Sequence, residues 1–466
     1  MSERWDLAIL GGGPGGYVAA LRAAQLKRKV VLVENDRLGG TCMNYGCIPT
    51  KYLLYQTKIY KEFRENKNFE GPLEEIKCNW RRMQDEKNKT VERLVNGIEF
   101  LLKRNGVEIL RGTGFLKGEK EKQVVVDTEE GEKILEADKV ILATGSSPAG
   151  LSFIDPNGIE VITSREALEL DSIPRDILII GAGAIGLEMG MIYRRLGTDV
   201  TILEILPTIL PGCDREIVTR LERLLKLQGL KINTQMKIEE SEIKDSKVRL
   251  KGTCLESKSP FEFEAEKVLI AAGRKPNSGG LSEKLLLDKQ GFVRVNAQLE
   301  TGIPGIYAIG DLIGGKLLAH KASHEGIIAA ENASGLEETM NYEALPMAVY
   351  TSPEFSSVGY TEQEAQGRGI KHHIGLFSLQ ANGRALTMGK AEGIVKVIVD
   401  GRDKIIGGHI LAPNASEIIT EITVAMNNGL KVQDVFASIH IHPTLSEAVM
   451  EASMKAKNRA LHILNT

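Results

Sequence analysis

Two cysteines, Cys42 and Cys47, are separated by four residues in a stretch that also carries Gly40, Thr41 and Lys51. A thiolate attacks a disulfide when its pKa is low, it is accessible, and a second thiol lies nearby. The pair therefore has the types and spacing for electron transfer to or from a dithiol. Two unrelated buried thiols and half of a zinc site are the alternatives. The sequence has no second Cys/His pair at metal spacing nearby, which weakens the zinc alternative and leaves the other two open.

The residues before this pair have the pattern of a dinucleotide-binding module. An apolar run at Asp6–Leu10 predicts a buried strand, Pro14 predicts the start of a helix, and Val30–Val33 predicts a second strand that ends in Glu34. Between strand and helix stands G-x-G-x-x-G, formed by Gly11, Gly13 and Gly16. Such glycines allow a tight turn, a close approach to pyrophosphate and close helix–strand packing. An acid after the second strand can accept hydrogen bonds from ribose hydroxyls.

The same pattern recurs near the middle of the chain. A strand at Ile177–Ile180 precedes a second G-x-G-x-x-G and a helix through Leu196, and a strand at Val200–Leu203 ends in Glu204. The second motif consists of Gly181, Gly183 and Gly186. The last glycine and the acid are 18 residues apart in both copies (34 − 16 and 204 − 186). A carboxylate at Glu204, with no Arg following closely, favours the free 2′-hydroxyl of NAD over the 2′-phosphate of NADP.

The remaining segments predict the elements around these modules. Residues 53–105 have helical periodicity, 107–138 predict short strands, and 139–144 and 267–273 predict buried strands. A strand in Gly305–Asp311 ends in an acid, which either binds a ligand at the sheet edge or caps a helix. From residue 343 the pattern predicts a sheet with flanking helices. Its clearest features are a strand at Ile394–Val399, a turn at Gly407-Gly408 and a helix over Ser416–Asn427.

Near the C-terminus, His442 is followed by a proline and, five residues on, by Glu447. A carboxylate that hydrogen-bonds a histidine ring is the arrangement of an oriented general base. A surface histidine with no catalytic role explains this segment equally well when it is taken alone.

The composition excludes several classes of protein. The 466 residues have a net charge of −3, which argues against nucleic acid or an anionic membrane as partner. Apolar runs are too short to span a bilayer, and the charged N-terminus does not resemble a signal peptide. Five cysteines are too few for a secreted disulfide framework. We therefore expect a reducing compartment, the cytoplasm or the mitochondrial matrix, with no metal site.

Together these features resemble the flavoprotein disulfide reductases over essentially the whole chain. The resemblance implies an α/β fold with two Rossmann-like modules and a C-terminal α+β dimerisation domain. It also implies a homodimer, with FAD on the first module and NAD on the second. The implied boundaries are 1–148 for the first part of the FAD domain, 149–272 for the NAD domain, 273–342 for a central domain that completes the FAD site, and 343–466 for the dimerisation domain.

The cysteine and histidine motifs look most like those of family members that oxidise dihydrolipoamide with NAD. By this resemblance Cys42 exchanges with the substrate dithiol, Cys47 is the flavin-side thiol of the same disulfide, and His442, supported by Glu447, is a base supplied by the other subunit. Lys51 matches a lysine beside the flavin, and Glu188 its partner. The implied partners are lipoylated domains of 2-oxo acid dehydrogenase or glycine cleavage complexes.

The resemblance also assigns the cofactor sites residue by residue. The implied FAD site comprises Gly11, Gly13, Pro14, Gly15, Gly16, Glu34, Gly40, Thr41, Lys51, Gly114, Thr144, Gly145, Gly310, Asp311 and Ala319. The implied NAD site comprises Gly181, Gly183, Ala184, Ile185, Gly186, Glu188, Glu204 and Gly273.

Three residues depart from the family pattern: Tyr45, Tyr52 and His324, which we expect to tune the potential or the substrate channel. The competing functions are a glutathione-type reductase, which Glu204 argues against, and a non-catalytic flavoprotein scaffold. Reductases that need a further cysteine pair near the C-terminus are disfavoured because the last cysteine is Cys254.

Overall fold

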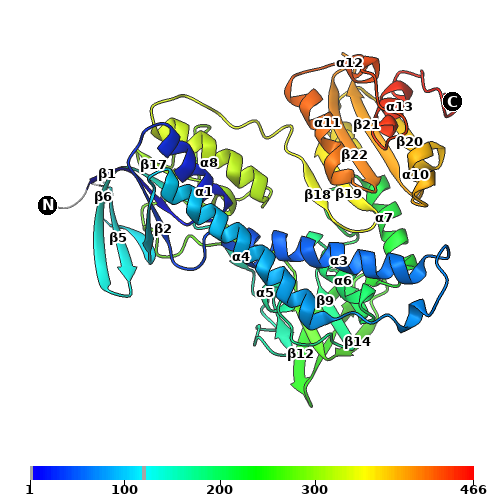
Figure 1. The fold of residues 1–466 in the computed structure, drawn as a ribbon, viewed down its shortest axis with the longest axis horizontal. Helices are drawn as coiled ribbons and strands as arrows, with labels where there is room; N and C mark the ends of the chain where they lie inside the picture. The colour runs from blue at the N-terminus through cyan, green and yellow to red at the C-terminus, as the bar shows by residue number, and fades with distance from the viewer. Residues whose placement is uncertain (1–3, 118–121, 466) are drawn as a thin grey trace. The chain divides into compact units, whose positions relative to one another are not determined.

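A computed structural model describes residues 4–117 and 122–465 (Figure 1). The described chain divides into two compact units. Unit 1 consists of Met1–Leu151, Thr163–Ser172 and Ala272–Met340, and unit 2 consists of Ser152–Ile162, Ile173–Ala271 and Asn341–Thr466. The division of the chain into four domains stays a prediction. No helix within the described ranges is long and apolar enough to cross a membrane.

Unit 1 is built on a seven-stranded sheet with the order β3-β2-β1-β6-β5-β4, and β17 pairs with β6. β1, β2, β3, β6 and β17 pair in parallel, whereas β4, β5 and β6 form an antiparallel meander. The strands are β1 (Arg4–Leu10), β2 (Val30–Glu34), β3 (Glu108–Arg111), β4 (Thr113–Lys117), β5 (Gln123–Thr128), β6 (Gly131–Leu142) and β17 (Ile306–Ala308). Ile9, Leu32 and Ile141 are fully buried, so the predicted apolar strands form the core.

Helices cover this sheet. α1 (Pro14–Gln25) and α8 (Ala319–Ala333) lie side by side, and the long α4 (Trp80–Arg104) packs nearby (Figure 1). α2 (Gly40–Tyr45) and α3 (Cys47–Glu65) follow β2 and carry the cysteine pair. The short elements of this unit are η1 (Leu73–Glu75), β7 (Ser146–Pro148), α5 (Ser164–Ala167), β16 (Arg274–Pro276) and η2 (Gly310–Ile313).

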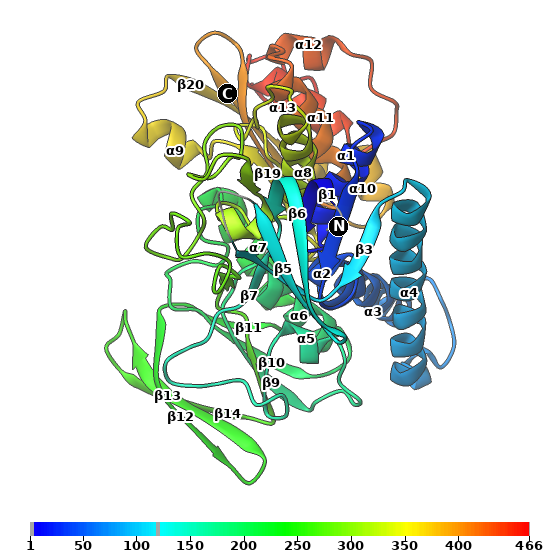
Figure 2. The same ribbon diagram turned by 90° about the vertical axis from the view of Figure 1, so that its left-hand side faces the viewer.

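Unit 2 contains the second module, a parallel sheet in the order β11-β10-β9-β15-β8. Its elements are β8 (Val161–Ile162), β9 (Asp176–Ile180), α6 (Ala184–Arg195), β10 (Asp199–Leu203), α7 (Arg215–Leu227), β11 (Lys231–Asn233) and β15 (Lys267–Ile270). An antiparallel sheet of β12 (Met236–Lys244), β13 (Lys247–Cys254) and β14 (Pro260–Ala265) extends from it, drawn in green in Figure 2.

The C-terminal part of unit 2 is an antiparallel sheet in the order β18-β19-β22-β21-β20 with helices packed on it. The strands are β18 (Met347–Val349), β19 (Glu354–Gly359), β20 (His372–Ser378), β21 (Ile394–Asp400) and β22 (Ile405–Ala412). The helices are α9 (Glu362–Gly367), η3 (Leu379–Ala381), α10 (Gly383–Thr387), α11 (Ala415–Asn427), α12 (Val432–Ala437) and α13 (Glu447–Lys455). The predicted fold class, two parallel nucleotide-binding sheets and a C-terminal α+β domain, is confirmed.

One local prediction was wrong. Gly407 and Gly408 form no turn but lie inside β22. A Cβ on Gly407 would overlap the carbonyl of Tyr360, and a Cβ on Gly408 would lie 2.7 Å from the side chain of Ile422 on α11. Glycine is required here because a neighbouring strand and a helix approach the backbone closely, and no turn is involved.

A buried ionic cluster joins α7, α9 and β21 within unit 2. Lys396, fully buried in β21, donates to Asp214 at 3.1 Å, Glu216 at 3.3 Å and Glu362 at 2.6 Å. Asp214 also accepts the N–H groups of Ile217 and Glu362, so it caps α7 and holds the start of α9. Such a paired buried charge is costly to break, because removal of one partner leaves the other desolvated.

Candidate functional site

The first glycine loop takes the geometry that its glycines predict. Gly11 adopts φ +103°, a conformation that side chains disfavour, and donates its N–H to the Val33 carbonyl at 2.8 Å. A Cβ on Gly16 would overlap the Gly11 carbonyl oxygen, so α1 packs against the loop only because glycine stands there. Gly13 precedes α1 with no side-chain cap, and Pro14 occupies the first turn. The first-turn N–H groups of α1 thus suit a phosphate.

Glu34 does more in this loop than the sequence predicts. It is 8% exposed, and one carboxylate oxygen accepts the Gly12 N–H at 2.6 Å while the other accepts the Asp36 N–H at 2.8 Å. The carboxylate therefore holds the glycine loop to the end of β2. A carboxylate after the second strand of such a module can also accept hydrogen bonds from ribose hydroxyls, which fits the dinucleotide implied by the sequence.

The second module repeats this geometry contact by contact. Gly181 adopts φ +107° and donates to the Leu203 carbonyl at 2.8 Å. Glu204, 7% exposed, accepts the N–H groups of Ala182 at 2.7 Å and Leu206 at 2.9 Å. A Cβ on Gly186 would overlap the Gly181 carbonyl, as in the first copy. Among the other residues predicted for this site, Gly183 is the N-cap of α6, with no side-chain hydrogen bond there, and Ala184 and Ile185 open the helix.

The redox stretch is attached directly to the first glycine loop. Gly39 donates its N–H to the Gly12 carbonyl at 2.8 Å, and a Cβ on Gly40 would lie 2.7 Å from Gly13. Gly39 and Gly40 have φ of +88° and +56°, so glycine permits both the turn and the contact. Thr41 follows, exposed on the first turn of α2. Within unit 1, the segment that carries the cysteines is therefore in direct contact with the first glycine loop.

Cys42 on α2 and Cys47 at the start of α3 form a disulfide, with Cα atoms 4.7 Å apart. The Asn44 amide between them donates to the carbonyls of Leu38 and Gly40, each at 3.0 Å. Thr50 donates its hydroxyl to the Gly46 carbonyl at 2.6 Å. These bonds fix the backbone on both sides of the disulfide without closing the sulfurs inside the core, since both cysteines are half-buried.

Lys51 and Glu188 lie on separate helices. Lys51 is four residues after Cys47 on α3, which puts the two side chains on one helix face. Glu188 is 4% exposed on α6 and accepts the Tyr350 N–H at 3.0 Å. Lys51 belongs to unit 1 and Glu188 to unit 2, so their predicted pairing stays a prediction.

Asp311 belongs to a polar network that the sequence did not predict. Its carboxylate accepts the hydroxyl of Ser146 at 2.5 Å and lies 3.8 Å from Arg274, which donates to the same Ser146 hydroxyl at 2.7 Å. Arg274 is half-buried, and burial lowers its pKa, although Asp311 opposes that shift. β7 pairs with β16 and thereby brings Ser146 beside Arg274. The network fixes a carboxylate at the end of β17, where parallel sheets bind ligands.

Two further contacts hold the same edge of the sheet. Asn277 donates its amide to the Thr144 carbonyl, and Thr144 returns its hydroxyl to the Asn277 carbonyl, both at 2.9 Å. Gly310 donates its N–H at 2.7 Å to Glu325 on α8, a fully buried carboxylate that pairs with Lys321 at 3.0 Å. Ser146, Arg274 and Asn277 were missed because their contacts join segments far apart in sequence, and Glu325 was missed although it accepts from Gly310 only 15 residues away.

The remaining predicted residues lie on several elements of unit 1. Gly15, whose Cβ would lie 3.0 Å from Ile309, packs α1 on the sheet end; Gly145 and Gly273 have φ of +70° and +113° with open space around them; and Gly114 lies on β4 against Leu10. Ala319 is the first residue of α8. Tyr52 is partly buried on α3, which raises its pKa, and His324 is exposed on α8.

His442 and Glu447 interact as the spacing predicts. The His442 Nδ1 atom lies 2.9 Å from one oxygen of Glu447, and the other oxygen accepts the Thr444 N–H at 2.7 Å. Burial alone would raise the pKa of Glu447, but the hydrogen bonds from Thr444 and His442 hold it below its ordinary value. An ionised Glu447 requires the proton on Nδ1, which leaves Nε2 free to accept one. The His442 side chain is 79% exposed, so that nitrogen is accessible.

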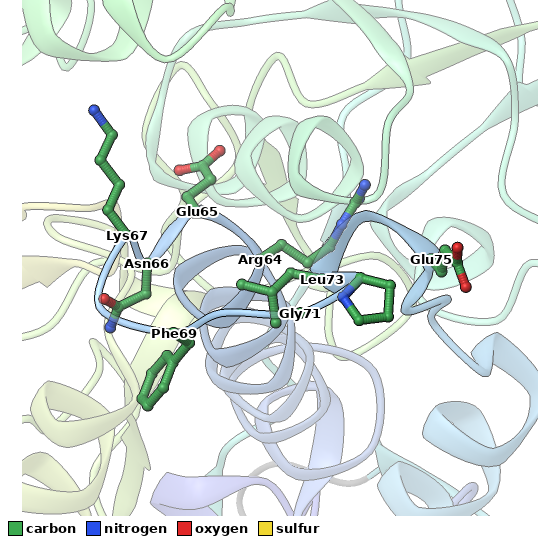
Figure 3. A pocket seen from close by; sticks show the side chains of 9 residues that line it. Arg64, Glu65, Asn66, Lys67, Phe69, Gly71, Leu73 and Glu75 are labelled. Carbon is green, nitrogen blue, oxygen red and sulfur yellow. The ribbon is translucent and has the colours of Figure 1, made fainter.

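A shallow pocket follows α3 and is lined only by residues 64–75 (Figure 3). Its labelled side chains include Arg64, Lys67 and Phe69, and it contains no predicted site residue. The chemistry-bearing residues therefore lie elsewhere: at the ends of β1, β2, β6 and β17, at the disulfide between α2 and α3, at the second glycine loop, and at the start of α13.

Comparisons with known proteins agree with this arrangement. Residues 5–326 match the model of the pyridine nucleotide-disulphide oxidoreductases, and residues 345–453 match the dimerisation domain of the same family, which implies a homodimer. The dihydrolipoyl dehydrogenase of Thermus scotoductus is 42% identical, with 99% of this chain and 100% of that protein covered. The mitochondrial dihydrolipoyl dehydrogenase of Pisum sativum is 39% identical, covering 99% and 93%.

A solved structure gives the same result at the level of the fold. LpdA from Mycobacterium tuberculosis superposes with a TM-score of 0.89 at 27% identity, over 97% of this chain and 99% of that one. Members of the family bind FAD and a nicotinamide dinucleotide, and the two glycine loops described above fit two such groups. The chain therefore belongs to the dihydrolipoyl dehydrogenase family of pyridine nucleotide-disulphide oxidoreductases.

Proposed function

We propose that this chain oxidises dihydrolipoamide carried on lipoylated proteins to lipoamide and reduces NAD⁺ to NADH. It would do so as a component of 2-oxo acid dehydrogenase or glycine cleavage complexes. The Cys42–Cys47 disulfide, attached to the first dinucleotide loop, carries the proposal. A disulfide that closes so short a loop gains little from chain entropy, which suits a bond that opens in each turnover.

The exchange proceeds in two balanced steps. A substrate thiolate attacks the Cys42 sulfur, the Cys42–Cys47 bond breaks, and Cys47 leaves as a thiolate. The second substrate thiol gives its proton to His442 and attacks the substrate sulfur now bound to Cys42. Cys42 then leaves as a thiolate, the substrate closes its own disulfide, and the enzyme dithiol holds the two electrons. Bound FAD would supply an electron acceptor for this dithiol and hydride chemistry toward NAD⁺.

The residues of this chain position that chemistry. Gly11, Gly13 and Asp311 would hold FAD, and Gly181 and Gly183 would hold NAD. Lys51 and Glu188 would hold the flavin edge. The carboxylate of Glu447 would keep His442 in the tautomer that accepts a proton at Nε2 and would stabilise the imidazolium that results. In the family resemblance His442 and Glu447 serve the disulfide of the other subunit, so the homodimer would be the catalytic unit.

The choice of nicotinamide cofactor rests on Glu204. A carboxylate at the end of β10 disfavours the 2′-phosphate of NADP by charge repulsion, and the following residues, Ile205 and Leu206, are exposed and uncharged. The glutathione-type alternative needs NADPH, so the ratio of kcat/KM for the two cofactors separates the candidates. We expect the enzyme to oxidise dihydrolipoamide with NAD⁺. We expect no reduction of oxidised glutathione with NADPH. Equal kcat/KM for NAD⁺ and NADP⁺ would contradict the proposal, and a flavin-loaded chain without turnover would support the scaffold alternative.

Serine variants of the two cysteines distinguish the roles of their sulfurs. In an anaerobic NADH titration the reduced holoenzyme should show a long-wavelength absorbance band that persists in Cys42→Ser and disappears in Cys47→Ser. The reverse result would exchange the two assignments.

The subunit arrangement is tested by complementation. Inactive Cys42→Ser and His442→Gln chains are mixed and allowed to exchange. Each heterodimer would then carry one site with both lesions and one intact site, so activity should recover toward half. Heterodimers that form and hold FAD but stay inactive would place base and disulfide on one chain.

A further inference from the structure

Tyr45 lies between the two cysteines in the sequence, and its side chain contacts both a cation and a carboxylate. It is the last residue of α2, three residues after Cys42, so the two side chains are neighbours on one helix face. The Arg165 guanidinium lies over its ring, 3.8 Å from the centroid. Its hydroxyl donates to the Asp36 carboxylate at 3.2 Å. The ring thus links the redox helix to a cation on a segment far away in sequence.

Both contacts of Tyr45 come from anchored groups. Asp36 donates its N–H to Glu34, and its carbonyl accepts from Arg111 at 2.6 Å, so it is fixed to the end of β2. Arg165 belongs to α5, whose segment Thr163–Ser172 is part of unit 1. The next residues of that segment are held by α4. The buried Lys87 donates to the Leu168 carbonyl at 2.6 Å, and the Trp80 indole donates to the Leu170 carbonyl at 2.7 Å.

The position of Arg165 places a positive charge close to the first sulfur. Neighbouring Cβ atoms on a helix face are about 5–6 Å apart, and the guanidinium lies 3.8 Å from the ring centroid, so its distance from the Cys42 sulfur is on the order of 10 Å. The other charges near the ring are weaker supports for a thiolate. Asp36 is negative, and Arg37 is paired with Glu92 of α4. Arg165 is stacked on an aromatic face, a geometry that holds a cation in place.

We propose that Arg165, stacked on Tyr45, is a positioning residue that stabilises the thiolate released from Cys42 during disulfide exchange. The inference rests on the proposed role of Cys42. In the second exchange step the bond between Cys42 and the substrate sulfur breaks, and its electron pair goes to Cys42. A leaving thiolate that is stabilised leaves faster and is present at a higher fraction. At an effective dielectric constant of about 20 to 80 and an ionic strength of about 0.01 M, a unit charge at this distance changes the thiol–thiolate ratio by about two- to sevenfold.

The test is alkylation of the reduced holoenzyme. The enzyme is reduced anaerobically with NADH and treated with iodoacetamide over a range of pH, and the labelled cysteine is identified by peptide mapping. In buffer of about 0.01 M ionic strength, Arg165→Met should slow labelling of Cys42 at neutral pH by about two- to sevenfold and move the profile to higher pH, with the limiting rate at high pH unchanged or slightly raised. Tyr45→Val removes the platform and should act in the same direction, whereas Arg165→Lys keeps the charge and should return most of the rate.

Arg104→Met is the matched control, because Arg104 stacks on Phe100 at 5.5 Å at the other end of α4. It should leave the profile unchanged. Label on Cys42 with the same profile in wild type and Arg165→Met would overturn the role of Arg165 alone. Label on Cys47 in the wild type would overturn the assignment of the two sulfurs and, with it, this inference. A lowered limiting rate at high pH would show that the substitution alters access to the sulfur rather than its charge environment, which would also overturn it.

Discussion

Replacement of Glu447 by Gln should impair the base more than replacement by Ala. Both Glu447 oxygens accept, one from His442 Nδ1 at 2.9 Å and one from the Thr444 N–H at 2.7 Å. A glutamine has one oxygen and one NH₂. If the oxygen stays with Thr444, the NH₂ faces Nδ1, favours the tautomer with its proton on Nε2, and blocks the atom that must accept the substrate proton. If the amide is flipped, its NH₂ faces the Thr444 N–H, so two donors face each other without an acceptor.

The magnitude follows from the bond that has to break. The hydrogen bond from the glutamine NH₂ to His442 Nδ1 joins two neutral groups and is worth about 0.5–1.5 kcal/mol, so recovery of the productive tautomer costs about 2- to 13-fold in rate beyond the loss of the carboxylate that both variants share. Glu447→Ala leaves the exposed imidazole free to adopt either tautomer in water and should cost only a few-fold, about tenfold at most. His442→Gln removes the base itself and should cost the most, about 10²–10⁴-fold.

Rapid mixing separates the two half-reactions. Reduction of the bound flavin by dihydrolipoamide should slow more in Glu447→Gln than in Glu447→Ala, whereas reduction by NADH should stay near the wild-type rate in both variants. Glu451→Gln is the control, because Glu451 holds His462 through the same kind of contact at 2.7 Å. An alanine variant slower than the glutamine variant would refute the tautomer argument.

Two further predictions concern stability. Lys396→Met leaves the fully buried Asp214 without its cation and should lower the free energy of unfolding by about 3–5 kcal/mol in denaturant titrations. Adding Asp214→Asn should return part of that loss. An unchanged denaturation midpoint in Lys396→Met would contradict the argument from the buried ion pair. Burial lowers the pKa of His409 although Asp214 opposes the shift, so below about pH 6.5 the unfolded chain binds a proton that the folded chain does not. Stability should therefore be fully present above that pH and fall below it by at most about 1.4 kcal/mol per pH unit, and a slope that is no smaller in His409→Gln would contradict this assignment.

Local sterics explain why much of the fold could be predicted. The two glycine loops are required by contacts within a few residues, such as the overlap a Cβ on Gly16 would make with Gly11, so their pattern is visible in any sequence that folds this way. The His442–Glu447 contact spans five residues and follows from the same local logic. In contrast, Ser146 meets Arg274 only after β7 pairs with β16, 128 residues later.

The turn expected at Gly407-Gly408 is an error of the opposite kind, because an element was predicted that the structure does not contain at these residues. Glycine pairs commonly mark turns, so local propensity favoured one. The requirement that selects glycine there is the approach of Tyr360 and of Ile422, neither of which is near in sequence. Packing between segments that are distant in sequence thus explains both the missed contact of Ser146 with Arg274 and the wrong prediction of a turn at Gly407-Gly408.

The double contact made by Glu204 has a consequence for redesign of cofactor preference. The side chain expected to discriminate between two dinucleotides also accepts the Ala182 and Leu206 N–H groups, and Glu34 does the same for its own loop. An exchange of Glu204 for arginine would release both donors from a buried acceptor, so loss of activity in that variant would report a displaced loop as readily as a changed affinity. Conversion to the phosphorylated cofactor therefore calls for transplanting residues 181–186 and 204–206 together, from a protein in which another group closes the turn.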